Sequence, residues 1–271
     1  MRVETVPERA IGVFDSGVGG LTVLKELRRQ VPGEKLIYLG DTARVPYGTK
    51  SATTVLRYAH EAARFLLEQK VKLLVVACNT ASAVALEGLS EGYQVPVVGV
   101  IEPGARRAIE VSARGRIGVV GTEGTIRSGA YERALRRERA DVVVHTAACP
   151  LFVPLAEEGW AGHEVARLTA REYLAPLLAE GIDTLVLGCT HYPLLKPMLQ
   201  EIVGPQVRLV DSAQETAKAV AAKLKTHRLQ GQGQLVSAPR YFVTDIPDRF
   251  QRVGGAFLGE PLQGVTTVSL D

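Results

Sequence analysis

Two cysteines each end a short apolar run, and each is followed at once by hydroxyl or amide residues. Cys78 ends the run KLLVVAC and precedes an Asn-Thr pair, and Cys189 ends the run TLVLGC and precedes a Thr-His pair. A buried parallel strand that ends in a polar turn brings its last side chains to a ligand crevice. Two thiols placed in this way predict a site that is flanked by two acid/base groups.

Two thiols on opposite faces of a carbon atom suit racemisation. One removes a proton as the thiolate while the other donates a proton as the thiol, and the two exchange roles after each turnover. A free thiol has a pKa of about 8.5, so a thiolate needs a neighbouring base or a positive field. Asp15 ends the first expected strand, His191 lies two residues after Cys189, and Glu157 and Glu158 lie in the segment PLFVPLAEEGW, so these are candidate helpers.

Each of these residues also has a structural interpretation. A cysteine after a buried strand is more often a small core residue, although two at matched positions weaken that interpretation. Asp15 by itself is compatible with a helix N-cap, and His191 by itself with an ordinary capping or surface histidine. The turn DSGVGG lacks both the Walker lysine and the dinucleotide spacing, but its backbone amides can hold an anion. The third cysteine, Cys149, is interpreted as structural.

Apolar runs alternate with helical patterns along the chain. The expected strands are Ile11–Phe14, Leu36–Leu39, Leu73–Val76, Val97–Val100, Asp141–His145, Thr184–Gly188, Val207–Val210 and Arg240–Thr244, and the segment 116–122 matches the first strand with the start of its turn. The expected helices are Leu21–Val31, Ser51–Gln69, Ala81–Leu89 and Ala213–Leu229, the last followed by a Gln/Gly linker at Gln230–Gln234. Such alternation predicts parallel sheets with helices on both faces.

The second half of the chain repeats the first. Four segments recur in the same order at a period of about 106 to 111 residues, which indicates an internal duplication. The predicted fold class is therefore α/β, with two duplicated doubly wound parallel-sheet domains related by a pseudo-twofold axis and an active site in the cleft between them. We expect residues 1–102 plus 213–271 to form the domain that carries Cys78, and residues 103–212 to form the domain that carries Cys189.

Composition excludes several classes of function. The net charge of +3 over 271 residues, without a basic block, gives no support to nucleic-acid binding. No apolar run is long enough for a membrane span, and the N-terminal MRVETVPERA has no signal-peptide core. Three cysteines cannot form a closed disulfide framework, so we expect a reducing, cytoplasmic setting. Asn79 is the sole asparagine, a depletion that fits either a thermophilic source or GC-rich codon use.

Several longer motifs resemble one known family. DSGVGGLTVLKEL, GDTARVPYGTKS, VVACNTASA, GTEGTIRSGAYERAL and LVLGCTHYPLL together are similar to glutamate racemases. The similarity runs from about Ile11 to Asp211 and continues weakly through YFVTDIPDRFQRVGGAFLG. The cysteine motifs also occur in the wider aspartate/glutamate racemase superfamily, whereas DSGVGG, PYG and GCTHYP are typical of the glutamate branch. The resemblance implies racemisation of L-glutamate to D-glutamate for peptidoglycan synthesis, without a cofactor or a metal.

The resemblance also implies roles for individual residues. The implied catalytic positions are Cys78, Cys189, Asp15, His191, Glu157 and Asp41. Asp15 would assist Cys78, whereas His191 with Glu157 would assist Cys189. The resemblance assigns no specific role to Asp41. The implied substrate-binding positions are Asp15, Ser16, Tyr47, Gly48, Asn79, Thr80, Thr125, Thr190 and His191.

Other functions stay open at this point. The nearest alternative is an aspartate racemase of the same superfamily. A non-catalytic partner of DNA gyrase is another, although family members with that role tend to carry an N-terminal extension, and only ten residues precede Ile11 here. A thiol redox protein would want a Cys-x-x-Cys pair or two cysteines within bonding range. The sequence leaves open the oligomeric state, a homodimer included, the regulation by cell-wall precursors and the relative rates of the two directions.

Overall fold

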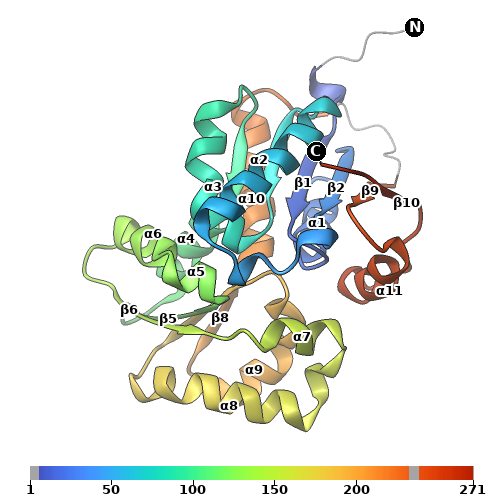
Figure 1. Cartoon of the computed structure of the whole chain (residues 1–271). Helices are drawn as coiled ribbons and strands as arrows, with labels where there is room; N and C mark the ends of the chain where they lie inside the picture. Colours follow the sequence, from blue (N-terminus) through green and yellow to red (C-terminus); the bar gives the residue numbers. More distant parts are fainter. Residues whose placement is uncertain (1–5, 232–237, 271) are drawn as a thin grey trace, which may run out of the picture.

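The computed structural model describes residues 6–231 and 238–270 and contains two parallel β-sheets, one in each lobe of the molecule (Figure 1). The strands are β1 (Ile11–Asp15), β2 (Leu36–Gly40), β3 (Leu73–Val76), β4 (Val97–Gly99), β5 (Arg116–Gly121), β6 (Val143–Ala148), β7 (Thr184–Gly188), β8 (Arg208–Asp211), β9 (Arg240–Val243) and β10 (Val265–Thr267). The larger sheet has the order β10-β9-β2-β1-β3-β4, and the smaller has the order β6-β5-β7-β8.

Helices connect and cover the strands. The α-helices are α1 (Leu21–Gln30), α2 (Ala52–Glu68), α3 (Asn79–Gly92), α4 (Ile101–Val111), α5 (Glu123–Arg127), α6 (Ala130–Glu138), α7 (Phe152–Glu157), α8 (Glu164–Ala179), α9 (Lys196–Val203), α10 (Ser212–Thr226) and α11 (Pro247–Leu258). Short 3-10 turns lie at η1 (Val6–Glu8), η2 (Thr42–Arg44), η3 (Tyr47–Thr49), η4 (Trp160–Gly162) and η5 (Tyr192–Leu195).

The larger sheet is buried on both faces, so its central strands are apolar without interruption. Val13 and Val75 lie in a core with residues of α1 and α10, whereas Phe14 and Val76 lie in a second core with residues of α2 and α3. This division follows the pleat, which sends successive side chains to opposite faces. The first of these cores continues into the smaller sheet through α4 and α6, so the two sheets share buried contacts.

The two sheets have corresponding strand orders. β2-β1-β3-β4 in the larger sheet matches β6-β5-β7-β8 in the smaller, with the tail strands β9 and β10 added beside β2. The predicted α/β class with two parallel sheets is confirmed. The pseudo-twofold axis and the exact division into domains stay predictions. The expected boundary at residues 102/103 falls within α4, and the boundary at 212/213 falls at the start of α10.

Some element boundaries differ from those expected. The strand expected at Asp141–His145 lies at Val143–Ala148. The helix expected from Ala81 begins at Asn79, because Cys78 itself acts as the N-cap. The helix expected to reach Leu229 ends at Thr226. Residues 232–234 of the expected linker lie outside the described residues, and no range was expected for α4 to α9, for α11 or for β10.

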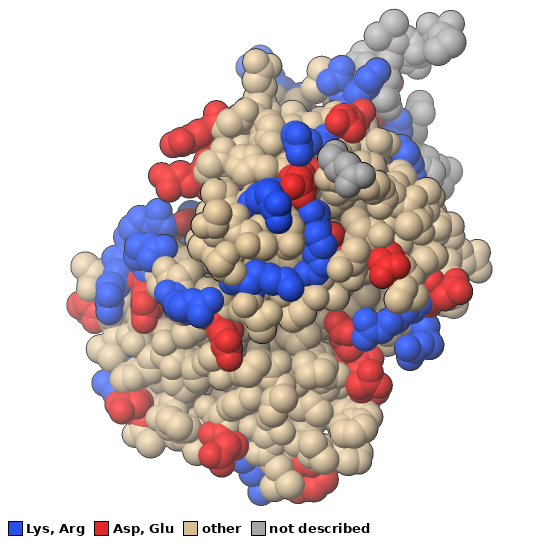
Figure 2. Space-filling model, viewed as in Figure 1, with Lys and Arg blue, Asp and Glu red and all other residues tan. Residues whose placement is uncertain are grey.

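The surface in the view of Figure 2 carries both signs of charge. Lys and Arg lie interspersed with Asp and Glu over both lobes on this face. Among the described residues, no helix has the length and apolar character needed to cross a bilayer.

Candidate active site

Both thiols lie directly after central strands of their sheets. Cys78 follows β3, which pairs with β1, and Cys189 follows β7, which pairs with β5. Their exposed fractions are only 5% and 6%. The two cysteines are therefore delivered at the carboxyl ends of equivalent strands, as the sequence predicted, and both are reduced.

The first thiol is surrounded by neutral hydrogen-bonding groups and a buried carboxyl group. Cys78 Sγ accepts the Ala81 N–H at 3.5 Å, and the thiol donates to Ser16 Oγ at 3.7 Å. Asp15, only 1% exposed, accepts the Gly17 N–H on Oδ2 at 3.0 Å. Burial, reinforced by the charge of Asp15, raises the pKa of Cys78 to about 12. The surroundings therefore hold Cys78 as a neutral thiol.

The carboxyl group of Asp15 is itself perturbed. Burial raises its pKa above the ordinary value, and the opposing effects of His191 and of the backbone amides of Gly20, Gly17 and Ser16 do not cancel that rise. Its second oxygen, Oδ1, has no hydrogen-bond partner among the described residues. A buried acceptor without a partner is costly, so Oδ1 is suited to a donor supplied by a ligand.

The second thiol lies beside a cation. His191 Nδ1 is 3.8 Å from Cys189 Sγ, and His191 Nε2 is 3.0 Å from Glu157 Oε1. Burial alone lowers the pKa of His191, but the hydrogen bonds with Cys189 and Glu157 and the charges of Cys189 and Asp15 outweigh it, and the pKa rises to about 10. A protonated imidazole can donate to the sulfur and to the carboxylate together. The geometry therefore places a cation beside the Cys189 sulfur.

The two thiol environments are close enough to influence each other. The charge of Cys189 contributes to the raised pKa of Cys78, and the charge of Asp15 contributes to that of His191. Gly19, in the turn after β1, packs so tightly that a Cβ there would overlap the side chains of Thr190 and His191. Only glycine permits this approach. The DSGVGG turn of the first half therefore lies against the Cys189 loop of the second half.

Polar residues from both halves meet near Cys78. Thr80 Oγ1 lies 2.9 Å from Thr122 Oγ1 and 3.2 Å from Thr125 Oγ1. Gly48 lies against the same cluster, because a Cβ at that position would come within 2.6 Å of Thr122 Cβ. Four positions from three segments are thus brought together, and three of them were expected to bind substrate. Thr122 was not singled out, although it stands in the quoted motif GTEGTIRSGAYERAL.

Asn79 is held in one orientation by a residue that sequence reasoning missed. Tyr131, on α6, donates its hydroxyl to Asn79 Oδ1 at 2.7 Å, and the Tyr131 hydroxyl is also hydrogen-bonded with Ser212. Asn79 Nδ2 is buried and has no partner among the described residues. The amide therefore keeps a free donor. Nothing in the local pattern around Tyr131 announces this contact, since the two residues come from different halves of the chain.

Asp41 is fully buried, and both of its oxygens have partners. Oδ2 accepts from Arg44 Nε at 2.7 Å and from the Tyr47 hydroxyl, and Oδ1 accepts from Thr244 Oγ1 at 2.9 Å. These contacts hold Tyr47 in place. A catalytic part for Asp41 stays a prediction, and the geometry gives it an orienting one.

The remaining candidates separate by exposure. Glu158 is exposed, whereas its neighbour Glu157 bonds with His191, so only Glu157 is placed to help Cys189. Arg249 of α11, which sequence reasoning missed, forms an ion pair with Glu157. Cys149 is fully buried in the core with Phe152, which agrees with a structural role. The described residues contain no group of three or more His, Cys, Asp or Glu side chains suited to a metal ion.

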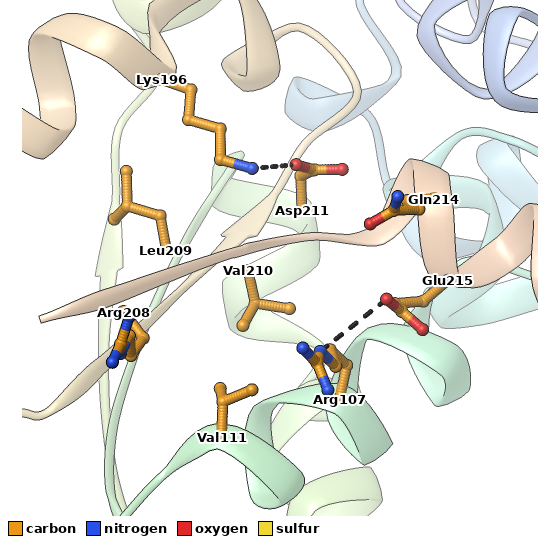
Figure 3. A pocket seen from close by; sticks show the side chains of 9 residues that line it. All are labelled: Arg107, Val111, Lys196, Arg208, Leu209, Val210, Asp211, Gln214 and Glu215. Atoms are coloured by element: carbon orange, nitrogen blue, oxygen red, sulfur yellow. Dashed lines mark hydrogen bonds and ion pairs between the residues drawn. The ribbon is translucent and has the colours of Figure 1, made fainter.

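A separate cavity of about 440 Å³ lies where β8 leads into α10 (Figure 3). Two of its three cations have acidic partners, since Lys196 Nζ lies 2.6 Å from Asp211 Oδ2 and Arg107 Nε lies 3.8 Å from Glu215 Oε1, and the third, Arg208, is exposed. Neither reactive thiol lines it. This cavity is therefore distinct from the thiol site and offers no unpaired buried group to a ligand.

Known proteins resemble the chain over nearly its whole length. A family model described as Asp/Glu/Hydantoin racemase matches residues 11–220. A glutamate racemase of Geobacter metallireducens is 60% identical over 266 residues, which cover 98% of each chain. The crystal structure of glutamate racemase isoform RacE1 from Bacillus anthracis has a TM-score of 0.94 at 41% identity, covering 97% of this chain and 98% of that one.

A third relative was solved with a ligand. The glutamate racemase of Francisella tularensis, in complex with D-glutamate, has a TM-score of 0.91 at 39% identity and covers 98% of this chain and 99% of that one.

Proposed function

Because the chain belongs to the Asp/Glu/Hydantoin racemase family and racemises glutamate, we propose that Cys78 and Cys189 are its two acid/base groups, one on each face of the α-carbon. The proposal includes the helper assignments, Asp15 for Cys78 and His191 with Glu157 for Cys189. It also includes independence of any cofactor. The D-glutamate that the reaction yields would supply peptidoglycan synthesis.

In the direction from L- to D-glutamate, the Cys189 thiolate removes the α-proton. The electron pair left on the α-carbon is delocalised into the α-carboxylate, where preorganised donors stabilise the added charge. The Cys78 thiol then donates its proton to the opposite face. The products are D-glutamate, a Cys78 thiolate and a Cys189 thiol, which is the arrangement that the reverse direction needs.

The unpartnered atoms of the site match the polar groups of an amino acid. Asp15 Oδ1 is a free acceptor that suits the α-ammonium, and Asn79 Nδ2 is a free donor that suits a carboxylate. The hydroxyl cluster of Thr80, Thr122 and Thr125 supplies further donors. The other proposed substrate contacts are Ser16, Tyr47, Gly48, Thr190 and His191.

One observation carries the proposal. Two buried thiols at equivalent strand ends have ionisable neighbours of opposite charge, and the charges of Cys189 and Asp15 act on Cys78 and His191 in the other half. A pair of core cysteines would have no reason to be placed in this way. We expect the two sulfurs to face each other across a gap that admits one substrate carbon.

A racemisation assay tests the proposal. Protein dialysed against chelator and freed of pyridoxal phosphate should convert L-glutamate to D-glutamate, followed by circular dichroism, and should convert L-aspartate far more slowly. Activity that returned only after a cofactor was added would refute the two-thiol mechanism. Equal or faster turnover of aspartate would refute the choice of substrate.

We propose a cytoplasmic location as well, since thiolate chemistry needs reduced cysteines. We also propose a homodimer. Large apolar side chains are exposed on the second half, which is typical of protein interfaces; they are Leu151, Trp160, Val165 and Leu168. Light scattering on the purified protein distinguishes the dimer from a monomer.

A further inference from the structure

An ion pair joins the tail of the chain to the helper group of the second thiol. Arg249 lies on α11, which follows β9 of the larger sheet and packs against α1. Its Nη2 atom lies 2.9 Å from Oε2 of Glu157, the last residue of α7 in the other lobe. Figure 1 shows α11 in the upper lobe and α7 in the lower lobe, both toward the right of the view. The contact therefore spans the two halves of the molecule.

Glu157 uses its two oxygens for two different cations. Oε2 accepts from Arg249, and Oε1 lies 3.0 Å from His191 Nε2. Although burial alone raises the pKa of Glu157, His191 and Arg249 together lower it below the ordinary value, so the group stays a carboxylate. A carboxylate with one oxygen fixed by an arginine cannot rotate away from the imidazole. The orientation of His191 toward Cys189 therefore depends on a residue of the tail.

The position of the pair links it to entry of the substrate. Both thiols are almost completely buried, so the site must open before glutamate can reach them. Arg249 and Glu157 together line a small surface cavity with Gly17 and Val18 of the glycine-rich turn. An opening movement on this side of the site would separate α11 from α7 and break the ion pair.

From these contacts we propose that Arg249 is a positioning residue for the Cys189 half of the reaction. Its ion pair with Glu157 forms as the site closes, and it holds Glu157 and His191 in the orientation that Cys189 requires. The inference rests on the proposed function, because it presupposes that Cys189 acts as an acid/base group. The charged groups that face His191 are Cys189, Glu157 and Asp15, and those that face Glu157 are His191 and Arg249.

If the ion pair had only a structural role, its loss would act on folding stability and not on one thiol. The Arg249 and Glu157 side chains are 49% and 19% exposed. An ion pair at such a site contributes little to folding stability. Loss of Arg249 should therefore leave the thermal unfolding midpoint nearly unchanged while it slows proton transfer at one thiol only.

The test compares Arg249→Gln with Arg249→Lys and with Arg252→Gln. Arg252 lies on the same helix, is exposed and has no ion pair within the described residues, so it is a matched control. The readout is elimination of chloride from each enantiomer of β-chloroalanine. There a thiolate removes the α-proton, chloride leaves, and the resulting aminoacrylate hydrolyses to pyruvate and ammonia, so only one thiol is needed.

Arg249→Gln should lower the kcat of elimination roughly tenfold, as expected when a charge-assisted hydrogen bond that orients a reacting group is lost. The loss should affect the enantiomer that Cys189→Ser affects, with KM within about twofold and the other enantiomer unchanged. Arg249→Lys should recover most of the rate, and Arg252→Gln should match the unchanged protein. Equal loss with both enantiomers, no loss, or an equal loss in Arg252→Gln would overturn the proposal.

The design separates this inference from the proposed function. If Cys189→Ser itself showed no preference between enantiomers, the assignment of one thiol to each face would fail. The positioning role of Arg249 would then be tested by the kcat of racemisation alone. The proposal predicts that this kcat falls in Arg249→Gln and recovers in Arg249→Lys. An unchanged kcat in Arg249→Gln would overturn it there too.

Discussion

Cys78 and Cys189 occupy equivalent places at the ends of β3 and β7, yet the groups beside them carry opposite charges. Cys78 lies beside the buried Asp15, which adds to the burial that raises the pKa of the thiol to about 12. Cys189 lies beside His191, whose own pKa is raised to about 10 by hydrogen bonds and charges that outweigh its burial. The duplicated fold therefore presents one neutral thiol and one thiol beside a cation.

The two thiols differ in whether the protein itself supplies a cation beside them. At Cys189 the cation is part of the protein and is held by Glu157. At Cys78 the described residues show no comparable cation, and we propose that the ammonium group of the substrate, bound at Asp15, supplies it. On this proposal the substrate-free chain is prepared for removal of a proton by Cys189 and its replacement by Cys78. We assign the L-enantiomer to Cys189 on this basis and on the family resemblance.

The largest effect is expected from removal of either thiol. Cys78→Ser and Cys189→Ser should each lower racemisation by roughly 10²- to 10⁴-fold, because a hydroxyl is a far weaker acid than a thiol. Elimination from β-chloroalanine should survive selectively, mainly with the L-analogue in Cys78→Ser and mainly with the D-analogue in Cys189→Ser. Pyruvate formation measures it. Equal loss with both enantiomers in both variants would leave the thiols important but end the assignment of one to each face.

Changes to the helpers should divide in the same way, with smaller effects. Asp15→Asn should slow elimination from the D-analogue and His191→Asn that from the L-analogue, each by about 10²-fold. Because enantiomers have equal free energies, the two directions of racemisation keep equal kcat/KM in every variant, so the comparison has to be made by elimination. The account would be contradicted if Asp15→Asn and His191→Asn both slowed elimination from the same enantiomer.

The two acidic neighbours in the second half provide a control for the helper series. Glu157→Gln should slow elimination from the L-analogue, because Glu157 is hydrogen-bonded with His191. Glu158→Gln, at the exposed adjacent residue, should leave both enantiomers unchanged. A loss of the same size in the two variants would show that general surface charge, and not the contact with His191, is responsible.

A moderate effect is expected at the bridge between Tyr131 and Asn79. Tyr131→Phe removes the donor that fixes the Asn79 amide, so KM should rise about fivefold for both enantiomers while kcat changes little. The control is Tyr173→Phe, which removes a hydroxyl whose one hydrogen bond within the described residues is accepted from the exposed Leu151 N–H. A fall in kcat at constant KM would mean that Tyr131 acts on the chemistry and not on binding.

An effect on stability, and not on activity, is expected at high pH. His191 keeps its proton in the folded chain to about pH 10, whereas in the unfolded chain it loses the proton near its ordinary value of 6.5. The stabilisation is therefore complete below pH 6.5 and is lost as the pH rises toward 10, with a slope of at most about 1.4 kcal/mol per pH unit. Urea unfolding at several pH values measures it, and His191→Asn should flatten the curve. An unchanged slope in His191→Asn would locate the titrating group elsewhere.

Much of this fold follows from local patterns. The central strands are buried on both faces and read as uninterrupted apolar runs, so the strands that carry Cys78 and Cys189 were placed to within a residue. Less periodic segments were placed less well. β6 is only half buried and exposed at its start, and it lies two residues beyond the expected position.

The contacts between the halves could not be predicted in the same way. Tyr131 and Arg249 act on residues 52 and 92 positions away in the sequence, and each stands in a helix with no local signal of its role. The helper assignments came from the family resemblance. Spacing alone did not distinguish which of the two neighbours, Glu157 or Glu158, contacts His191. Tertiary packing made that distinction, by turning Glu157 toward His191 and leaving its neighbour exposed.

The claim that two thiols serve opposite faces is tested most directly by racemisation of L-glutamate in heavy water, stopped at low conversion. The thiols exchange their protons with the solvent before turnover, so Cys78 delivers deuterium while Cys189 carries away protium. Mass spectrometry after chiral separation should find deuterium at the α-carbon of the D-glutamate formed and almost none in the remaining L-glutamate. Protium retained in the product, or deuterium entering the remaining L-glutamate as fast as the product forms, would mean that a single base serves both faces.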